Sequence, residues 1–148
     1  MTRLARSLAL FAMLAPLGAS AGEILRTRHF EYRVLGFRLV DGLGELRAAP
    51  GHRLAVVEFE ARNIDDEPRA VFIGTLRAEH AGGESRFDDP VAVPGVADKR
   101  FSELPVGAAE TMRFAYEVPA VLTGGKRWSW EPARAGGRRM ALDPSAPR

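Results

Sequence analysis

Metal-ligating side chains are the first residues in this sequence that could do chemistry. The three histidines, His29, His52 and His80, are far apart in the chain, and no pair has the close spacing of a metal site. Thioether sulfur is a ligand for Cu(I), so Met112 and Met140 could join the histidines in a copper site. Met112 also fits the apolar phase of an expected strand. We therefore expect no metal and no cofactor, and keep periplasmic copper handling as an alternative.

Acidic side chains cluster at two places in the chain. Asp65, Asp66 and Glu67 are consecutive, and Asp88 is followed directly by Asp89. The first cluster lacks both the alternating ligand spacing and the glycine of a calcium loop of the EF-hand type. Short acidic side chains bond their own backbone in reverse turns. We therefore interpret both clusters as turns rather than Ca²⁺ sites.

No catalytic constellation stands out among the nucleophiles and acids. A serine hydrolase needs a base and an orienting group beside its nucleophile. None of the serines after residue 21 lies in the strand–turn–helix pattern of a nucleophile elbow: Ser85, Ser102, Ser129 and Ser145. A glycosidase needs two facing carboxylates, and nothing singles out a pair among the 19 acidic residues. We expect no enzyme, and keep a hydrolase with an unrecognised carboxylate pair as a further alternative.

Two tryptophans give the sequence its candidate binding site. Trp128 and Trp130 alternate with Ser129 and Glu131, which places both indoles on one face of an expected strand. Their large area and N–H group could form a platform for sugar rings or for a partner's backbone. Large aromatic residues of this kind equally fill the core of a β-sandwich. Trp128 and Trp130 are therefore the candidate platform, with core packing as the competing interpretation.

The first 21 residues have the three parts of a secretory signal peptide. Arg3 and Arg6 precede an uncharged run over residues 7–17, which the small residues Gly18-Ala19-Ser20-Ala21 follow. The apolar run is about half the length of a membrane-spanning helix. We predict cleavage between Ala21 and Gly22, export to the periplasm or the medium, and no membrane span after cleavage.

Composition narrows the function of the remaining domain. With no cysteine in the chain, thiol nucleophiles, cysteine-ligated zinc, iron–sulfur and blue-copper sites are excluded. Without Arg3 and Arg6, 19 basic residues balance 19 acidic residues, so the charge does not favour nucleic acid. We predict one domain over residues 22–143, followed by a frayed tail over residues 144–148.

A period-two alternation of apolar and polar residues dominates this domain. Phe30, Tyr32 and Val34 alternate with charged residues, and the phase then shifts by one residue at Gly36. A one-residue shift turns the following side chains to the opposite face of a sheet. A glycine at such a shift is typical of a β-bulge, so we predict a bulged strand here.

The same alternation predicts three more long strands, over residues 53–62, 69–80 and 111–118, with a reverse turn over residues 63–68. Pro50-Gly51 predicts another turn, because proline presets its first central residue and glycine supplies a positive φ at the second. Turns or short strands are also expected at Asp41–Gly44, Arg86–Asp88, Lys99–Ser102, Trp128–Glu131 and Arg138–Leu142. About seven to nine strands and no helix predict an all-β, antiparallel β-sandwich.

Two stretches resemble a family of secreted bacterial domains. Residues 51–63 with Glu67-Pro68 are similar to the family's central signature, in which a glycine turn leads into an apolar strand, an Asn and a turn closed by Pro. Residues 104–107 and 114–119 are similar to its second signature, a Pro/Gly turn before a strand that ends in Pro. Val106 separates Pro from Gly here, whereas the family tends to place them side by side. The family is the immunoglobulin-like domains of unknown function related to the mycobacterial immunoprotective antigen.

The resemblance covers residues 30–142, nearly the whole expected domain. It implies an immunoglobulin-like sandwich, transfers no catalytic residue, and, because the chain lacks a lipidation cysteine, implies a freely soluble form. With the signal peptide, it leads us to expect an exported, non-catalytic binding or accessory domain of the cell envelope. Its partner would be a protein or an extracellular ligand, bound through loops at one end or through an edge strand.

Overall fold

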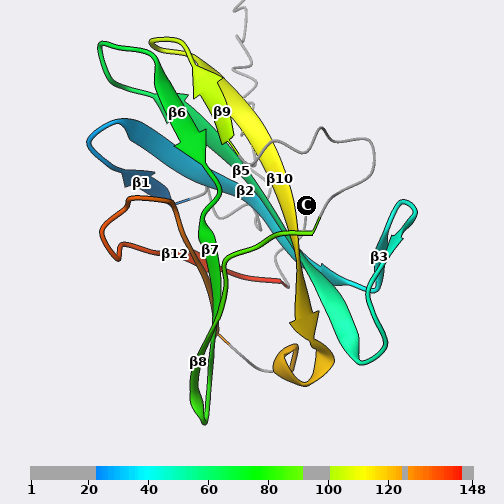
Figure 1. The fold of residues 1–148 in the computed structure, drawn as a ribbon. Helices are drawn as coiled ribbons and strands as arrows, with labels where there is room; N and C mark the ends of the chain where they lie inside the picture. Colours follow the sequence, from blue (N-terminus) through cyan, green and yellow to red (C-terminus); the bar gives the residue numbers. More distant parts are fainter. Residues whose placement is uncertain (1–22, 92–100, 125–126, 145–148) are drawn as a thin grey trace, which may run out of the picture.

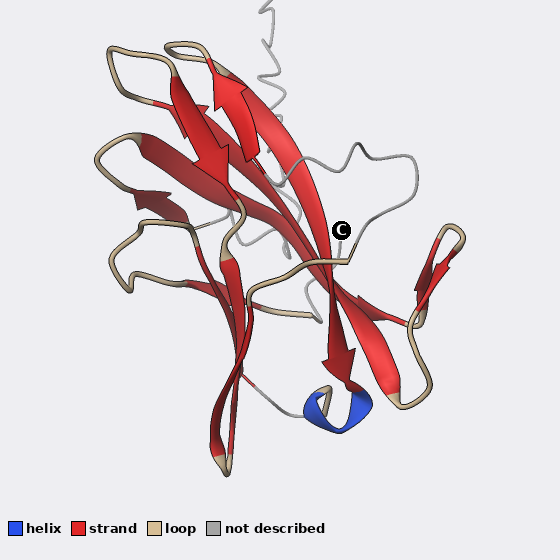
Figure 2. Cartoon of the chain, viewed as in Figure 1, coloured by secondary structure: helices blue, strands red, loops and turns tan. Residues whose placement is uncertain are grey.

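A computed structural model describes residues 23–91, 101–124 and 127–144. The predicted signal peptide, its cleavage bond between Ala21 and Gly22, and residues 145–148 of the predicted tail lie outside the described residues. Within them, almost all regular structure is strand (Figure 2). No helix in this part of the chain is long and apolar enough to cross a membrane.

Two four-stranded antiparallel sheets form the body of the protein (Figure 1). The first sheet has the order β1 (Ile24–Arg26), β2 (Phe30–Val40), β5 (His52–Asn63), β10 (Ala109–Pro119). The second has the order β12 (Met140–Leu142), β11 (Arg127–Glu131), β7 (Thr75–His80), β8 (Gly83–Phe87). Two ribbons accompany them, β3 (Gly42–Leu43) with β4 (Leu46–Arg47) and β6 (Arg69–Phe72) with β9 (Phe101–Leu104), and a single 3₁₀ turn, η1 (Ala120–Leu122), follows β10.

The core fills the space between the two sheets. Alternate residues of the long strands point into it, as predicted for residues 53–62 and 111–118. Trp130 of the second sheet packs on Phe59 of the first, with ring centroids 4.1 Å apart. The antiparallel β-sandwich predicted from the alternation is therefore confirmed.

The predicted bulge in β2 is present. Val34 pairs with Phe59 and Gly36 pairs with Glu58, so the register shifts by one residue and Leu35 is left exposed. Beyond the shift, Phe37 points into the core instead of outward. One extra residue thus lets both halves of an eleven-residue strand bury their aromatic side chains.

The single strand predicted over residues 69–80 is wrong. β6 pairs with β9, β7 pairs with β8 and β11, and the chain changes partners between them at Gly74. A Cβ at Gly74 would overlap the carbonyl of Glu131 and lie 2.5 Å from Trp130 Nε1, so only glycine fits. The Tyr116 hydroxyl donates a hydrogen bond of 2.9 Å to the Gly74 carbonyl. The break is fixed by contacts with residues more than 40 positions away in sequence.

A smaller apolar cluster lies on the outer face of the first sheet. Leu54, Val56 and Ala115 are buried there under residues of the β3–β4 hairpin and Val91. The hairpin stands where the sequence predicted a turn over residues 41–44. The predicted turn at Pro50-Gly51 is present, and Gly51 has the expected positive φ of 75°.

Candidate functional site

Three turns meet at one end of the sandwich (upper left in Figure 1), and we call them the turn cluster: residues 27–29, 64–68 and 105–108. Backbone hydrogen bonds join them. The Ile64 amide donates to His29 O at 2.9 Å, the Asn63 amide to Ala108 O at 2.9 Å, and the Gly107 amide to Asn63 O at 3.1 Å. The three turns are therefore held together as one surface.

The side chain of Asn63 fixes the turn cluster from inside. It is 1% exposed, and its Nδ2 donates to Glu67 O at 2.8 Å and to Leu104 O at 3.0 Å. Its Oδ1 accepts the Asp65 amide at 2.9 Å. A buried amide with these partners satisfies backbone groups that would otherwise be costly to bury. Asn63 thus shapes the turn over residues 64–68 and attaches it to the end of β9.

Asp65 adds a charged layer above Asn63. Its Oδ2 accepts from Arg69 Nε and from His29 Nδ1, each at 2.5 Å, and its Oδ1 accepts the Asp66 amide at 2.8 Å. The Arg69 guanidinium and the Asp66 amide hold the pKa of Asp65 well below its ordinary value. The carboxylate stays ionised at neutral pH and connects the β1–β2 turn to β6.

The turn cluster exposes two aliphatic side chains. Ile64 is 37% exposed and Val106 is 54% exposed. Val106 is the first central residue of a turn closed by the Ala108 amide on Pro105 O at 3.0 Å, with Gly107 at a φ of 73°. A type II turn of this kind projects its first central side chain outward. An apolar tip on a hydrogen-bonded frame can make contact with a partner without reordering its backbone.

A loop of two successive tight turns connects β11 to β12 near the same end. The Ala135 amide donates to Pro132 O at 3.1 Å, and the Arg138 amide donates to Ala135 O at 3.4 Å. Gly136 and Gly137, at the centre of the second turn, have φ of 66° and 85°, as a type I′ turn requires. Ala135 is buried in the core and anchors the loop there.

Arg134 occupies a strained position in this loop. Its φ is 60°, the one positive φ of a non-glycine among the described residues. For an L-residue this conformation costs about 1–2 kcal/mol. The guanidinium lies over the Phe72 ring with its carbon 4.9 Å from the centroid, a cation–π contact worth roughly 0.5–1 kcal/mol at an exposed site. The loop keeps an arginine where glycine would be favoured.

The outer face of the second sheet carries a ladder of ion pairs. Arg77, which is largely buried, contacts Glu131 at 2.7 Å and Glu84 at 2.5 Å, and Arg139 also pairs with Glu84. Arg139 and then Arg77 lower the pKa of Glu84. The two carboxylates are thus occupied by arginines of their own chain, which stabilises a polar face.

The structure brings together a histidine and a serine that the sequence did not connect. His80 Nε2 lies 2.9 Å from Ser85 Oγ across the β7–β8 hairpin, and the Gly82 amide donates to His80 Nδ1 at 3.2 Å. Both ring nitrogens of His80 are thus engaged within its own hairpin.

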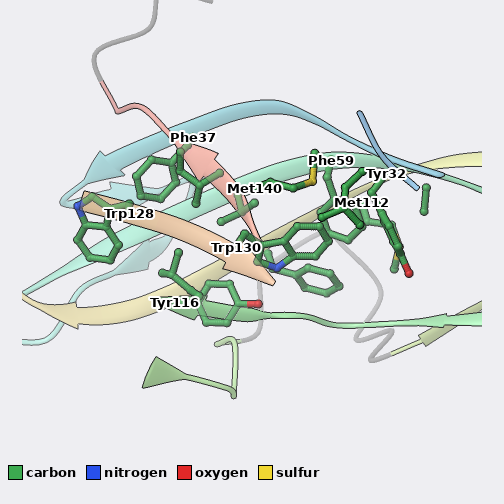
Figure 3. Packing of buried hydrophobic residues seen from close by; sticks show 14 of the residues in the cluster. Tyr32, Phe37, Phe59, Met112, Tyr116, Trp128, Trp130 and Met140 are labelled. Carbon is green, nitrogen blue, oxygen red and sulfur yellow. The ribbon is translucent and has the colours of Figure 1, made fainter. Parts of the chain in front are cut away.

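The aromatic platform predicted from Trp128 and Trp130 is wrong. Trp130 is 0% exposed and Trp128 is 3% exposed, so neither indole presents a surface (Figure 3). Trp130 meets Tyr32 edge to face at 5.8 Å, and Trp128 packs against Phe37 at 5.5 Å. Both indoles point between the sheets, because β11 turns its two aromatics towards the first sheet and Ser129 outward. The competing interpretation, core packing, holds.

The residues of the alternative copper site are not brought together. His29 bonds Asp65 in the turn cluster, His80 bonds Ser85 in its hairpin, and His52 Nδ1 lies 3.1 Å from Pro50 O in the β4–β5 turn. Met112 and Met140 are buried core residues. Among the described residues, no group of three or more His, Asp or Glu is placed to hold a metal ion.

Comparisons with known proteins bear on the fold. No protein-family model and no curated protein matches the sequence. A conserved hypothetical protein from Bacillus anthracis superposes with a TM-score of 0.56 at 15% identity, over 82% of this chain and 93% of its own. An uncharacterised beta-sandwich protein from Clostridium difficile gives a TM-score of 0.56 at 13% identity, over 82% and 89%. The chain is thus similar to β-sandwich proteins in fold.

The residues that shape the candidate surface were not singled out by the sequence. Residues 63–68 were predicted as a turn, but nothing in the sequence pairs Asn63 with Leu104, 41 positions later. Val106 had a usable signal, since Pro105-Val106-Gly107 is a tight-turn sequence and its central residue points outward. Arg134 had a weaker signal, an arginine just before Gly136-Gly137.

Proposed function

We propose that this chain is an exported, non-catalytic binding domain of the cell envelope that meets a protein partner through the turn cluster. The observation that carries the proposal is the pair of exposed aliphatic residues, Ile64 and Val106, on turns held together by backbone and Asn63 hydrogen bonds. An apolar centre within a polar rim is the arrangement found in protein interfaces. The export part of the proposal rests on the predicted signal peptide over residues 1–21. The immunoglobulin-like part rests on the sequence resemblance.

The rigidity of the surface supports binding rather than a passive end of the fold. Association is weakened by the entropy lost when loops become ordered, and a preformed surface avoids that loss. Here Asn63 and Asp65 together make six hydrogen bonds, which fix the turn over residues 64–68 before any partner arrives. The exposed residues around Ile64 and Val106 include side chains of both charge signs, among them Arg28, Asp66 and Glu67.

Site-specific cross-linking tests the proposal. A photoreactive amino acid would replace Val106 in the full-length chain, expressed in its own host. We expect one discrete cross-linked band, whose partner is identified by mass spectrometry, and the same partner from position 64. Val121 in η1, which is 83% exposed and lies after β10 at the other end, is the matched control. Cross-linking that is equal from positions 106 and 121, or absent from 106, rejects the turn cluster as the binding surface.

The same preparation tests export. The denaturing mass of the purified protein should equal that of residues 22–148, and a retained Met1 would contradict cleavage. Native mass spectrometry of the same sample would reveal a bound metal, and a stoichiometric metal would favour the copper alternative over a protein-binding domain.

A further inference from the structure

Two arginines of the β11–β12 loop, Arg134 and Arg138, lie at exposed positions. Among the residues that the structure describes, Arg134 and Arg138 have no carboxylate within ion-pair distance, whereas Arg69, Arg77 and Arg139 each contact one or two. The loop itself contains no acidic residue between positions 132 and 139. It is therefore a locally cationic surface.

Contacts within the protein hold both guanidiniums in place. Arg134 lies over the ring of Phe72, with its guanidinium carbon 4.9 Å from the ring centroid. Arg138 Nε donates to Ala135 O at 3.3 Å, which leaves its terminal nitrogens for other acceptors. Fixed, exposed guanidinium groups are suited to bidentate hydrogen bonds with carboxylates.

The backbone at Arg134 gives an independent reason to assign it a role. Gly136 and Gly137 adopt positive φ without strain, and glycine at position 134 would do the same. The chain instead has an arginine there, in a conformation that L side chains rarely adopt. A strained residue that the fold does not require is found most often at binding and catalytic sites.

The loop adjoins the turn cluster through β6. Arg69, at the first residue of β6, bonds Asp65 of the turn cluster, and Phe72, at the last residue, lies under Arg134. Four residues of strand span roughly 10 Å between their first and last Cα atoms. A partner seated on Ile64 and Val106 can therefore reach this loop with a short segment.

We infer that Arg134 and Arg138 bind an acidic segment of the protein partner, with its Asp or Glu carboxylates on the two guanidiniums. This inference rests on the proposed function and names the chemistry of the partner. Two arginines are too few for the membrane anchors that read anionic lipid, which use about four to eight basic residues. The balanced charge of the domain also disfavours a nucleic-acid backbone.

A labelled hexaglutamate peptide is the direct probe. Fluorescence anisotropy at low salt would compare the wild-type protein with the double variant Arg134→Gly and Arg138→Gln. We expect binding that weakens about tenfold in the double variant, because a charge-assisted hydrogen bond is lost at each site. The matched control is Arg33→Gln with Arg127→Gln, which removes the same charge from exposed strand positions and should change the affinity by less than about twofold.

Three results would overturn the inference. The first is equal loss of hexaglutamate binding in both double variants, which would indicate only net charge. The second is equally tight binding of hexalysine. The third is binding of phosphatidylglycerol vesicles that depends on Arg134 and Arg138 while the peptide does not bind. A melting temperature of the loop variant within a few degrees of wild type shows that the fold is intact.

Cross-linking separates this inference from the proposed function. If the cross-link from position 106 forms in the wild type and is reduced severalfold by Arg134→Gly with Arg138→Gln, both stand. If the loop variant leaves that cross-link unchanged, the inference fails and the turn cluster remains the binding surface. If position 106 gives no cross-link in the wild type, the proposed function fails whatever the peptide does.

Discussion

Between the sheets, Trp130 packs on Phe59 and Tyr32 with few directional contacts. In the turn cluster, the side chains of Asn63 and Asp65 instead make hydrogen bonds to specific atoms of two turns and of the end of β9. The core gains stability from the area removed from water, which depends little on orientation. The turn cluster depends instead on the positions of hydrogen-bond donors and acceptors. The two regions therefore differ in what a substitution should change.

This difference separates the stability of the sandwich from the shape of its end. Loss of packing between the sheets should lower the free energy of unfolding without selectively altering any turn. Loss of a polar bond in the turn cluster should alter local geometry and pH dependence more than global stability. The substitutions below test that separation, in order of decreasing expected effect.

The largest effect is expected for Trp130→Ala. Removing a fully buried indole should lower the free energy of unfolding by about 3–5 kcal/mol. Trp130→Phe should lose less, because the indole Nε1 has no hydrogen-bond partner among the described atoms. Urea unfolding at pH 7 measures both, with exposed Ile24→Ala as the control, expected within about 0.5 kcal/mol of wild type. A loss below 1 kcal/mol for the alanine variant would contradict the packing argument.

Asn63→Ala should have the next largest effect. It leaves the Leu104 and Glu67 carbonyls and the Asp65 amide without their partner, at about 1 kcal/mol for each group that stays buried, or about 2–3 kcal/mol in all. Amide hydrogen exchange should rise first in residues 64–68 and 105–108. If amide exchange instead rises uniformly over both sheets, Asn63 contributes to global stability as a core residue does. Asn63→Asp, which keeps the acceptor and loses the donors, tests which bonds matter.

Asp65→Asn should show a pH-dependent effect. The folded-state pKa of Asp65 is lowered by Arg69 and by the Asp66 amide, so its ionised form stabilises the fold above the ordinary aspartate pKa of about 3.9. That stabilisation is lost as the pH falls below this value. We expect the melting temperature of the variant to be lower than wild type at pH 7, and the difference to begin narrowing below about pH 4, because the folded-state pKa lies lower still. A difference that persists unchanged at pH 3 would show that the carboxylate charge is not its source.

The smallest effect on stability is expected for Arg134→Gly. Relief of the positive φ offsets the lost cation–π contact and the greater freedom of glycine in the unfolded chain, so the net change should lie within about 1 kcal/mol. Thermal unfolding measures it, and Phe72→Leu is the companion variant that removes the contact while keeping the arginine. A loss above 2 kcal/mol would show that Arg134 is a structural residue.

The local sequence pattern was sufficient to predict individual strands and tight turns. The bulge at Gly36 was predictable because the alternation changes phase there, and the turn at Pro50-Gly51 because proline and glycine fit its two central positions. The break at Gly74 was not, because its cause is the indole of Trp130 on β11, a strand that pairs with β7 but lies far later in the sequence. The alternation on β11 likewise placed Trp128 and Trp130 on one face without indicating which face is inside.

The candidate surface was less predictable than the fold, for a related reason. A turn sequence identifies which residues bond their own backbone, as Asp65 does with its neighbour Asp66. It carries no information on the bond from Asn63 to Leu104 or from Asp65 to His29, which join segments far apart in the chain. Surfaces built from several turns depend on such bonds, so they become visible only once the strands are in place.

The change of partners at Gly74 also has a kinetic consequence. β6 belongs to the ribbon with β9, and β7 completes the second sheet only when β11 arrives some fifty residues later. Contacts that close long loops form late, because closing the loop costs chain entropy before the contact contributes its stabilising free energy. We therefore expect the β2–β5 pair, which closes the shorter loop, to form early, and both the pairing of β10 with β5 and the docking of Trp130 beside Gly74 to be late folding steps. Gly74, which makes room for that indole, would thereby act at the stage when the second layer is completed.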